Sequence, residues 1–163
     1  MTTNGADHLL HLHHEIVQPG WVDYNDHLND GYYMVIFSNA TTALMDHIGL
    51  GAEARAATGC TLFTLETHIN YLREVKGGAE ARIDTQILGH DQKRLHVFHT
   101  MFAGESDEPR ATNEQMLLHI DMTGPKAAPF RPAVLAHIET IVAAQAGLPR
   151  PANAGRAIAL PRR

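Results

Sequence analysis

A cluster of polar side chains lies directly before the clearest helical pattern of this 163-residue sequence. One short stretch carries carboxylate, imidazole and amide groups at Asp23, Asn25, Asp26, His27 and Asn29. A carboxylate or an imidazole can serve as a general base, and a carboxylate can also be a nucleophile. The start of a helix offers unpaired backbone N–H groups and partial positive charge, which suit a developing oxyanion. We therefore predict the active site at this junction.

The helix that follows the cluster is expected to form part of the core. Apolar or small residues recur at steps of three or four, which places them on one face: Tyr33, Ile36, Phe37, Ala40, Ala43, Leu44 and Ile48. Asn29 and Asp30 are favourable N-cap residues, and Gly49 is a favourable stop signal. The predicted helix therefore begins directly beneath the polar cluster, and its apolar face must be covered by another element.

Five predicted strands and a second helix account for most of the other residues. The strands cover residues 8–17, 61–75, 79–88, 94–103 and 111–122, and the helix covers residues 132–146. Residues 51–59 have no apolar period and are expected to form a connection. Alternation in the second strand predicts two faces, one with Phe63, Leu65, Thr67, Ile69 and Tyr71 and one with Thr64, Glu66, His68 and Asn70. The order of elements predicts an α+β fold, in which a mostly antiparallel sheet wraps around one long helix.

Length and composition favour one domain, which we assign to residues 1–147, followed by a tail at 148–163 with three prolines and four arginines. The net charge of −5 argues against a nucleic-acid-binding protein. The sequence shows neither an apolar run of about 18 residues nor a signal-peptide pattern, so we expect no membrane association and a cytoplasmic location. The single cysteine, Cys60, suits that reducing compartment.

Histidine is abundant, with 12 residues, but its spacing does not specify a metal site. His11 and His13 are expected to share one face of the first strand, yet no HExxH motif or cysteine partner accompanies them. We therefore predict no metal. A His-rich metal-binding protein stays as an alternative without the required ligand spacing.

Aromatic residues gather at the same junction. Trp21, Tyr24 and Tyr32 lie off the apolar stripe of the helix, whereas Tyr33 and Phe37 lie on it and are expected in the core. Aromatic faces bind quaternary ammonium groups through cation–π attraction. The first three residues are therefore candidates to bind a trimethylammonium group, although they would equally suit a benzoyl or medium-chain acyl group.

Several strings in the sequence resemble a known family. Residues 23–30, DYNDHLND, look like the D-x-x-G-H-x-N-N signature of the 4-hydroxybenzoyl-CoA thioesterase-like group of the hotdog superfamily. VDYN-x-HLNDGYY, LFTLE, NYLRE and KRLH-x-F are closer still to thioesterases of carnitine breakdown that act on betainyl-CoA. The resemblance spans residues 17 to about 122 and implies a hotdog fold with an extra C-terminal helix.

The resemblance implies that Asp23 is the catalytic carboxylate of an acyl-CoA thioesterase, either as nucleophile or as general base. The backbone N–H groups around Asp30 and Gly31 would stabilise the carbonyl oxygen. His27 and Asn29 would orient the loop or contact the ligand. Asp26 replaces the glycine that is usual in the family; it adds a second carboxylate that could raise one pKa or attract a cationic acyl group.

The resemblance also implies a homodimer or dimer of dimers with the site between two subunits. Glu66 and Asn70 would then approach the site from the partner to position water or the carbonyl. The candidates for binding the CoA phosphates are Arg73, Lys76, Lys93 and Arg94. No metal or redox cofactor is implied, since CoA is part of the substrate. The alternatives are a thioesterase for aromatic or fatty acyl-CoA and a non-catalytic acyl-CoA binding or sensing module.

Overall fold

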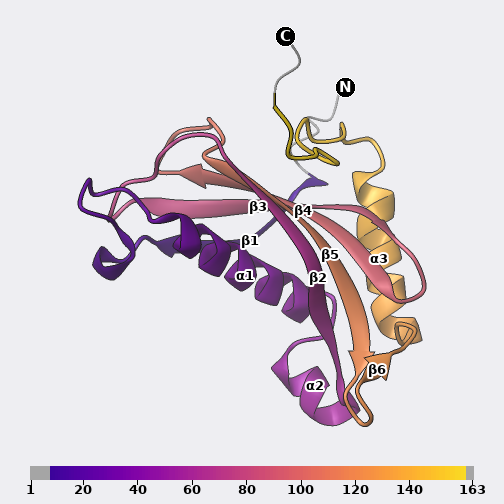
Figure 1. Cartoon of the computed structure of the whole chain (residues 1–163). Helices are drawn as coiled ribbons and strands as arrows, with labels where there is room; N and C mark the ends of the chain where they lie inside the picture. The colour runs from indigo at the N-terminus through magenta and orange to yellow at the C-terminus, as the bar shows by residue number, and fades with distance from the viewer. Residues whose placement is uncertain (1–7, 161–163) are drawn as a thin grey trace.

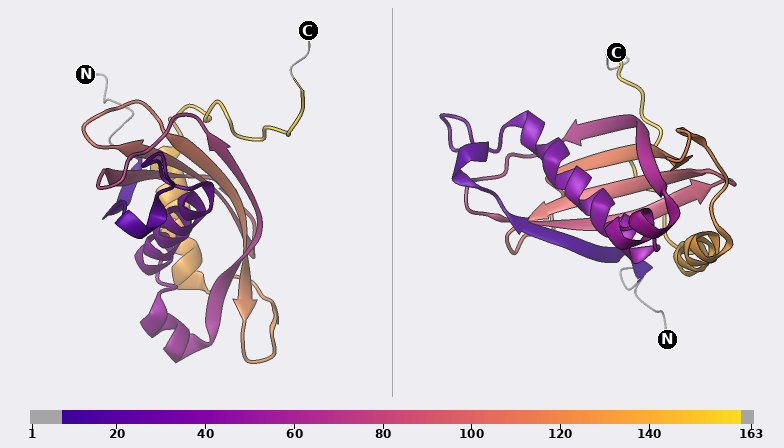
Figure 2. Two further views of the ribbon diagram at one scale, coloured as in Figure 1. Left: turned by 60° about the vertical axis from the view of Figure 1, so that its left-hand side comes forward. Right: turned by 90° about the horizontal axis from the view of Figure 1, so that it is seen from below.

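The computed structural model describes residues 8–160, and it confirms the expected antiparallel sheet wrapped around one long helix (Figure 1). The expected elements are β1 (Leu10–Ile16), α1 (Asp30–His47), β2 (Cys60–Tyr71), β3 (Glu80–His90), β4 (Arg94–Ala103), β5 (Ala111–Asp121) and α3 (Pro132–Gln145). The strand order is β1-β3-β4-β5-β2, and all pairs are antiparallel. The sheet curls so that α1 crosses its concave side (Figure 2). No helix among residues 8–160 is long and apolar enough to cross a membrane.

Both predicted ends of α1 are confirmed. The side chain of Asn29 caps the helix, because its Oδ1 accepts a hydrogen bond from the Gly31 N–H at 3.1 Å. At the other end Gly49 adopts a φ of +83°, the left-handed conformation that favours glycine after a helix. Residues of the predicted stripe, Ile36, Phe37 and Leu44 among them, are fully buried against the sheet. Burial of this stripe, rather than helix propensity alone, holds α1 in place.

A chain of buried hydrogen bonds connects α1 to the sheet. His99 on β4 is fully buried, with its ring stacked on Phe37. Its Nδ1 lies 2.9 Å from Oγ1 of Thr85, and its Nε2 lies 3.1 Å from Oγ1 of Thr41. Thr41 in turn donates to Oε1 of Gln115 at 2.9 Å. A single arrangement of the protons satisfies all three bonds. The Thr85 hydroxyl donates to Nδ1 of His99, and Nε2 of the neutral His99 ring donates to the Thr41 hydroxyl.

The predicted faces of β2 are partly wrong. The pairing register with β5 shifts between Thr64 and Glu66, so β2 carries a bulge that interrupts the alternation. Thr67 still faces inward, toward Asn113, and the Tyr71 ring packs edge-on against Tyr33. Before the bulge the prediction fails, because Phe63 and Leu65 are 46% and 56% exposed. β2 also ends at Tyr71 rather than at residue 75, since the amides of Leu72 and Arg73 both bond to the Arg110 carbonyl.

Three short elements were not expected. Residues predicted as a connection contain the helix α2 (Ala52–Thr58), and the chain also forms a 3-10 turn η2 (Pro19–Trp21) and a short strand β6 (Lys126–Ala127) paired with β5. α2 ends in Gly59 at a φ of +71°. Since it has no buried residue, a search for an apolar period could not detect it.

The β1 edge of the sheet has an irregular pairing register. The register of β1 shifts between Leu10 and His13, so the predicted shared face of His11 and His13 is wrong: His11 contacts Asp84, and His13 contacts Glu15. Ahead of Leu10, the first residue of β1, Gln145 of α3 takes over the pairing with β3. Its Oε1 accepts from the Ile87 N–H at 2.8 Å, and its Nε2 donates to the Thr85 carbonyl at 3.2 Å.

The C-terminal segment after α3 runs across the outer face of the sheet (Figure 2). The Gly155 N–H donates to Oε2 of Glu114 on β5 at 2.7 Å, while Oε1 of Glu114 lies 2.7 Å from Nε2 of His96. Asn153 also approaches Thr112 at 3.5 Å. The part of the predicted tail that lies within residues 148–160 is therefore attached to the domain at residues 153–155.

Candidate functional site

The loop from Val22 to Leu28 is a tight turn organised by Asp23. Val22 and Leu28 form an isolated bridge, and the Asp23 N–H donates to the His27 carbonyl at 2.8 Å. Oδ1 of Asp23 accepts from the amides of Asn25 at 2.8 Å and His27 at 3.1 Å. These amides, that of His27 first, hold the pKa of Asp23 below its ordinary value. Asp23 is thus an ionised carboxylate that is held by the backbone of its own loop through Oδ1.

Asp26 occupies the position that requires unusual backbone angles. With a φ of +60°, it is the only non-glycine residue within 8–160 in the left-handed region. Its side chain also lies against Gly77, where an added Cβ would come within 2.7 Å of its Oδ1. The expected tolerance of aspartate in this turn is therefore confirmed. The expected rise in pKa from two close carboxylates is not found at Asp23, whose pKa is lowered.

The start of α1 offers a free donor, at Asp30 rather than Gly31. The Gly31 N–H is already shared by Oδ1 of Asn29 at 3.1 Å and Oδ1 of Asp30 at 2.9 Å. The Asp30 N–H, at the first helical position, has no hydrogen-bond acceptor among residues 8–160. The Gly31 amide reaches a substrate oxygen only if the two side chains release it. Asn29 therefore has a structural role in this conformation, as a cap.

The aromatic candidates are only partly brought together. Trp21 and Tyr32 stack with their ring centroids 5.6 Å apart and an angle of 15° between the planes. Tyr24 is 97% exposed, and its ring packs against no other aromatic ring in the described part of the chain. Since each stacked ring covers one face of the other, a cation has access only to an outer face of this pair. Tyr33 and Phe37 are buried in the core, as predicted.

Tyr71 connects β2 to the start of the helix. Its hydroxyl donates to the Asp30 carbonyl at 3.2 Å. Burial, with a smaller contribution from the Asp30 carboxylate, raises the pKa of Tyr71 above its ordinary value, so the hydroxyl keeps its proton. Sequence reasoning placed Tyr71 on the apolar face of a strand and gave it no functional role. The contact could not be predicted, because it joins residues 41 positions apart.

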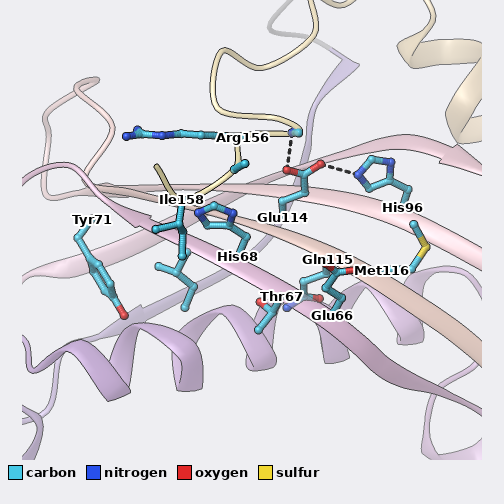
Figure 3. Close-up of a pocket in the computed structure, with 13 residues that line it drawn as sticks. Glu66, Thr67, His68, Tyr71, His96, Glu114, Gln115, Met116, Arg156 and Ile158 are labelled. Atoms are coloured by element: carbon cyan, nitrogen blue, oxygen red, sulfur yellow. Dashed lines mark hydrogen bonds and ion pairs between the residues drawn. The ribbon is translucent and has the colours of Figure 1, made fainter. Parts of the chain in front are cut away.

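Glu66 lies apart from this helix start, in a groove of about 770 Å³ on the β2 side of the sheet (Figure 3). Within one chain the groove is lined by residues of β2, β4, β5 and the C-terminal segment, among them Glu66, His68, Tyr71, Glu114, Arg156 and Ile158. Asp23 is not among its lining residues. Asn70 lies nearby on β2, paired with Thr112. A single chain therefore does not bring Glu66 into the loop that holds Asp23.

The four predicted CoA-binding residues divide between opposite ends of the sheet. Lys76 lies beside the loop, where it pairs with His27 in an isolated bridge and its Nζ approaches the Asn25 carbonyl at 3.4 Å. Arg73 follows the same end of β2, and its Nε lies 3.3 Å from Glu108. Lys93 and Arg94 begin β4 at the other end, about 30 Å away at ~3.3 Å per residue. There Asp91 accepts from both of their amides and pairs with Arg94 at 3.4 Å, which suits a structural role.

A second hollow, of about 260 Å³, lies between α1 and the β2–β5 pair. Its lining is rich in hydroxyl and amide groups, with Ser38, Thr41, Thr42, Thr61, Thr64 and Gln115 among them. Nε2 of Gln115 and Oδ1 of the neighbouring Asn113 are buried without hydrogen-bond partners in the described chain. Sequence reasoning missed this region. The signal was present, since Asn113 and Gln115 occupy alternate positions of β5 that face the core.

The residues that the structure describes form no cluster of three or more His, Cys, Asp or Glu side chains suited to a metal ion. His11, His13 and His14 line one shallow hollow, but each ring contacts a different carboxylate: Asp84, Glu15 and Glu80. The chemistry available at the loop is therefore that of the ionised Asp23 and of the backbone donors at the start of α1.

Comparison with known proteins places this geometry in a family. A betainyl-CoA thioesterase of Pseudomonas aeruginosa is 52% identical over 145 residues, which are 89% of this chain and 91% of that protein. An L-carnitine dehydrogenase/betainyl-CoA thioesterase of Agrobacterium fabrum is 42% identical over 94% of this chain, which spans 31% of that longer protein.

Solved structures agree with these sequence matches. A proposed thioesterase from Pseudomonas putida KT2440 is 48% identical, with a TM-score of 0.83 and coverage of 94% of this chain and 98% of the other. A Staphylococcus aureus protein solved in complex with CoA is 30% identical, with a TM-score of 0.86 and coverage of 94% and 97%. The model of the thioesterase-like superfamily matches residues 17–138, and the chain belongs to this superfamily of hotdog-fold thioester hydrolases.

Proposed function

We propose that the protein hydrolyses betainyl-CoA to betaine and CoA, with Asp23 as its catalytic carboxylate. The observation that carries the proposal is an ionised Asp23 whose loop enters directly into the N-terminus of α1. Overall, water cleaves the thioester bond, the acyl carbon gains an oxygen, and the thiol of CoA leaves with a proton. Asp23 serves either by attacking the carbonyl carbon or by accepting a proton from the attacking water.

The developing oxyanion would be stabilised at the start of α1. The free Asp30 N–H lies at the positive end of an 18-residue helix, where backbone dipoles favour negative charge. The Tyr71 hydroxyl donates to the carbonyl of the same residue at 3.2 Å and so holds this turn against β2. Asn29 and His27 support the site indirectly: Asn29 caps α1, and the His27 backbone fixes the Asp23 turn.

The cationic acyl group fits the charge and the aromatic content of the loop. Asp26 and Asp30 add negative charge on either side of His27 and Asn29, and the Trp21–Tyr32 stack offers an aromatic face close by in the chain. On the other end of the substrate, Arg73 and Lys76 lie at the loop end of the sheet and are the better candidates for the CoA phosphates. A CoA thioester substrate and the buried free thiol of Cys60 both suit the cytoplasm.

We further propose that the active species is a homodimer joined along β2. This strand of 12 residues lies at the open edge of the sheet, and it exposes Phe63 and Leu65 at 46% and 56%. Such an edge favours antiparallel pairing with an identical strand through a two-fold axis. The partner's strand would then lie beside Tyr71 and the start of α1, which supports a role for Glu66 and Asn70 across the interface. A dimer of dimers would need a further surface.

The test is thiol release from betainyl-, acetyl-, benzoyl- and octanoyl-CoA by the wild type, Asp23→Asn and a matched control, Asp107→Asn. Asp107 is a fully exposed carboxylate in the loop between β4 and β5. We expect Asp23→Asn to lower kcat by on the order of 100-fold or more, and Asp107→Asn to leave it unchanged. Preference for a neutral acyl chain would reject betainyl-CoA as substrate. Binding of all four thioesters without thiol release would identify a binding module instead.

A further inference from the structure

The last described residues of the chain form a highly exposed arm. Beyond its anchor at Gly155, the segment continues past the β2 edge of the sheet in both views of Figure 2. The arm, Ala157–Leu160, carries two large apolar side chains, and Ile158 and Leu160 are 93% and 91% exposed. Two such side chains at alternate positions of an extended segment lie on the same side of it. The described part of the same chain therefore anchors the arm but does not cover it.

A groove lies immediately beside the arm. Gly155–Ile158 line the 770 Å³ groove together with residues of the edge strand β2, Glu66 and His68 among them (Figure 3). Glu114, at the floor, holds the arm through the Gly155 amide. The lining includes two acidic residues, Glu66 and Glu114, and also Arg156, which directly precedes the arm. The arm and the groove both border the edge that the proposed dimer would use.

We propose that the arm Ala157–Leu160 docks on the outer face of a second copy of this chain, in that copy's groove, while the partner's arm returns to this one. The inference rests on the β2 pairing proposed above. A two-fold axis at β2 continues the sheet into the second copy, so an arm that projects past β2 must pass over the partner's outer face. Exchange of the two arms buries Ile158 and Leu160 of both chains, and it couples the C-terminus to assembly.

Site-specific photocrosslinking tests where the arm lies. Benzoylphenylalanine replaces Ile158 in one variant and Ala152, an exposed residue before the anchor, in a control. Irradiation of the full-length dimer is expected to join two chains through position 158, with the crosslinked peptide from β2 or β5, and not through position 152. Crosslinks from position 158 that stay within one chain would overturn the proposal.

Sedimentation equilibrium measures the contribution of the arm. The double variant Ile158→Ser/Leu160→Ser is expected to raise the dimer Kd on the order of 100-fold or more, because four large apolar side chains lose their buried positions. The control Ala157→Ser/Ala159→Ser, on the opposite side of the same arm, is expected to change the Kd less than threefold. A monomeric wild type would refute the β2 dimer itself. A wild-type dimer whose Kd is the same in both double variants would refute only the arm exchange.

Discussion

Buried His99 makes a specific prediction about stability at mildly acidic pH. The ring is fully buried between α1 and the sheet, and its nitrogens contact Thr41 and Thr85. Burial, with a smaller effect of His13, lowers the pKa of His99 to about 3. The native protein therefore keeps this imidazole neutral across the physiological range, whereas the unfolded chain protonates it near pH 6.5.

The sign and size of the effect follow from this difference in proton binding. Between about pH 6.5 and pH 3 the unfolded state binds the extra proton, so stability falls as the pH falls. The contribution of His99 is complete above pH 6.5 and decreases by about 1.4 kcal/mol for each pH unit within the window. From pH 7.5 to pH 5.5, the free energy of unfolding is expected to fall by about 1.4 kcal/mol through this residue alone.

Denaturant unfolding of the wild type and of His99→Gln at both pH values isolates this contribution. Glutamine keeps hydrogen-bonding capacity but does not titrate. The variant is expected to be less stable at pH 7.5, with a loss between pH 7.5 and pH 5.5 that is about 1.4 kcal/mol smaller than that of the wild type. His137→Gln, on the exposed side of α3, is the control and should keep the wild-type slope. If all three proteins share one slope, the reasoning about His99 is refuted.

Three further predictions concern single positions. Asp26→Gly suits the φ of +60°, so it should keep the free energy of unfolding in urea or raise it by up to about 1 kcal/mol. The same variant should lower kcat/KM for betainyl-CoA relative to kcat/KM for acetyl-CoA. If this ratio of kcat/KM values and the pH profile are both unchanged, a role for the Asp26 carboxylate is excluded. Gly49→Ala, at a φ of +83°, should lower the free energy of unfolding by about 1–2 kcal/mol. The control Gly124→Ala, at a position with open space around it, should lower it much less. Equal losses in the two variants would contradict the assignment of Gly49 as the residue that ends α1. Glu114→Ala should release the C-terminal segment and speed tryptic cleavage after Arg156. In the wild type, partial burial opposes the charged form of Glu114, but the hydrogen bonds from the Gly155 amide and the His96 ring outweigh this effect and lower the pKa of Glu114. The wild-type segment should therefore be released only as the pH falls below about 4.5, where Glu114 becomes protonated. Cleavage rates equal to the wild type at pH 7 would show that Glu114 does not hold the segment.

The parts of the fold that depend on local rules were predictable. Asn29 and Gly49 fix the ends of α1 through a side-chain cap and a left-handed turn, and each acts within a few residues. The left-handed turn at Asp26 followed from the family resemblance, which has a glycine at this position. The order of the strands around α1 followed from the periodicity of each segment and from the family resemblance, which together were sufficient for the architecture.

The parts that depend on distant partners were not predictable. The bulge between Thr64 and Glu66 exists only in the register of β2 with β5, so no pattern within β2 could reveal that Leu65 is exposed. Lys93 and Arg94 looked equivalent to Arg73 and Lys76, because a turn position does not tell which end of the sheet it occupies. The Gly31 amide was expected to be free, but two neighbouring side chains occupy it.

The irregular β1 edge has a consequence for the stoichiometry of the proposed dimer. β1 is a strand of seven residues with an irregular register. Its side chains at His11 and His14 contact carboxylates of β3, and Gln145 occupies the β3 backbone groups that β1 does not reach. Such an edge offers no regular ladder to an incoming strand. If the proposed dimer pairs through β2, each copy uses its one regular edge in that pairing, so growth by strand addition would end at two copies. The irregular register of β1 would therefore also protect the proposed dimer from growing strand by strand into fibres.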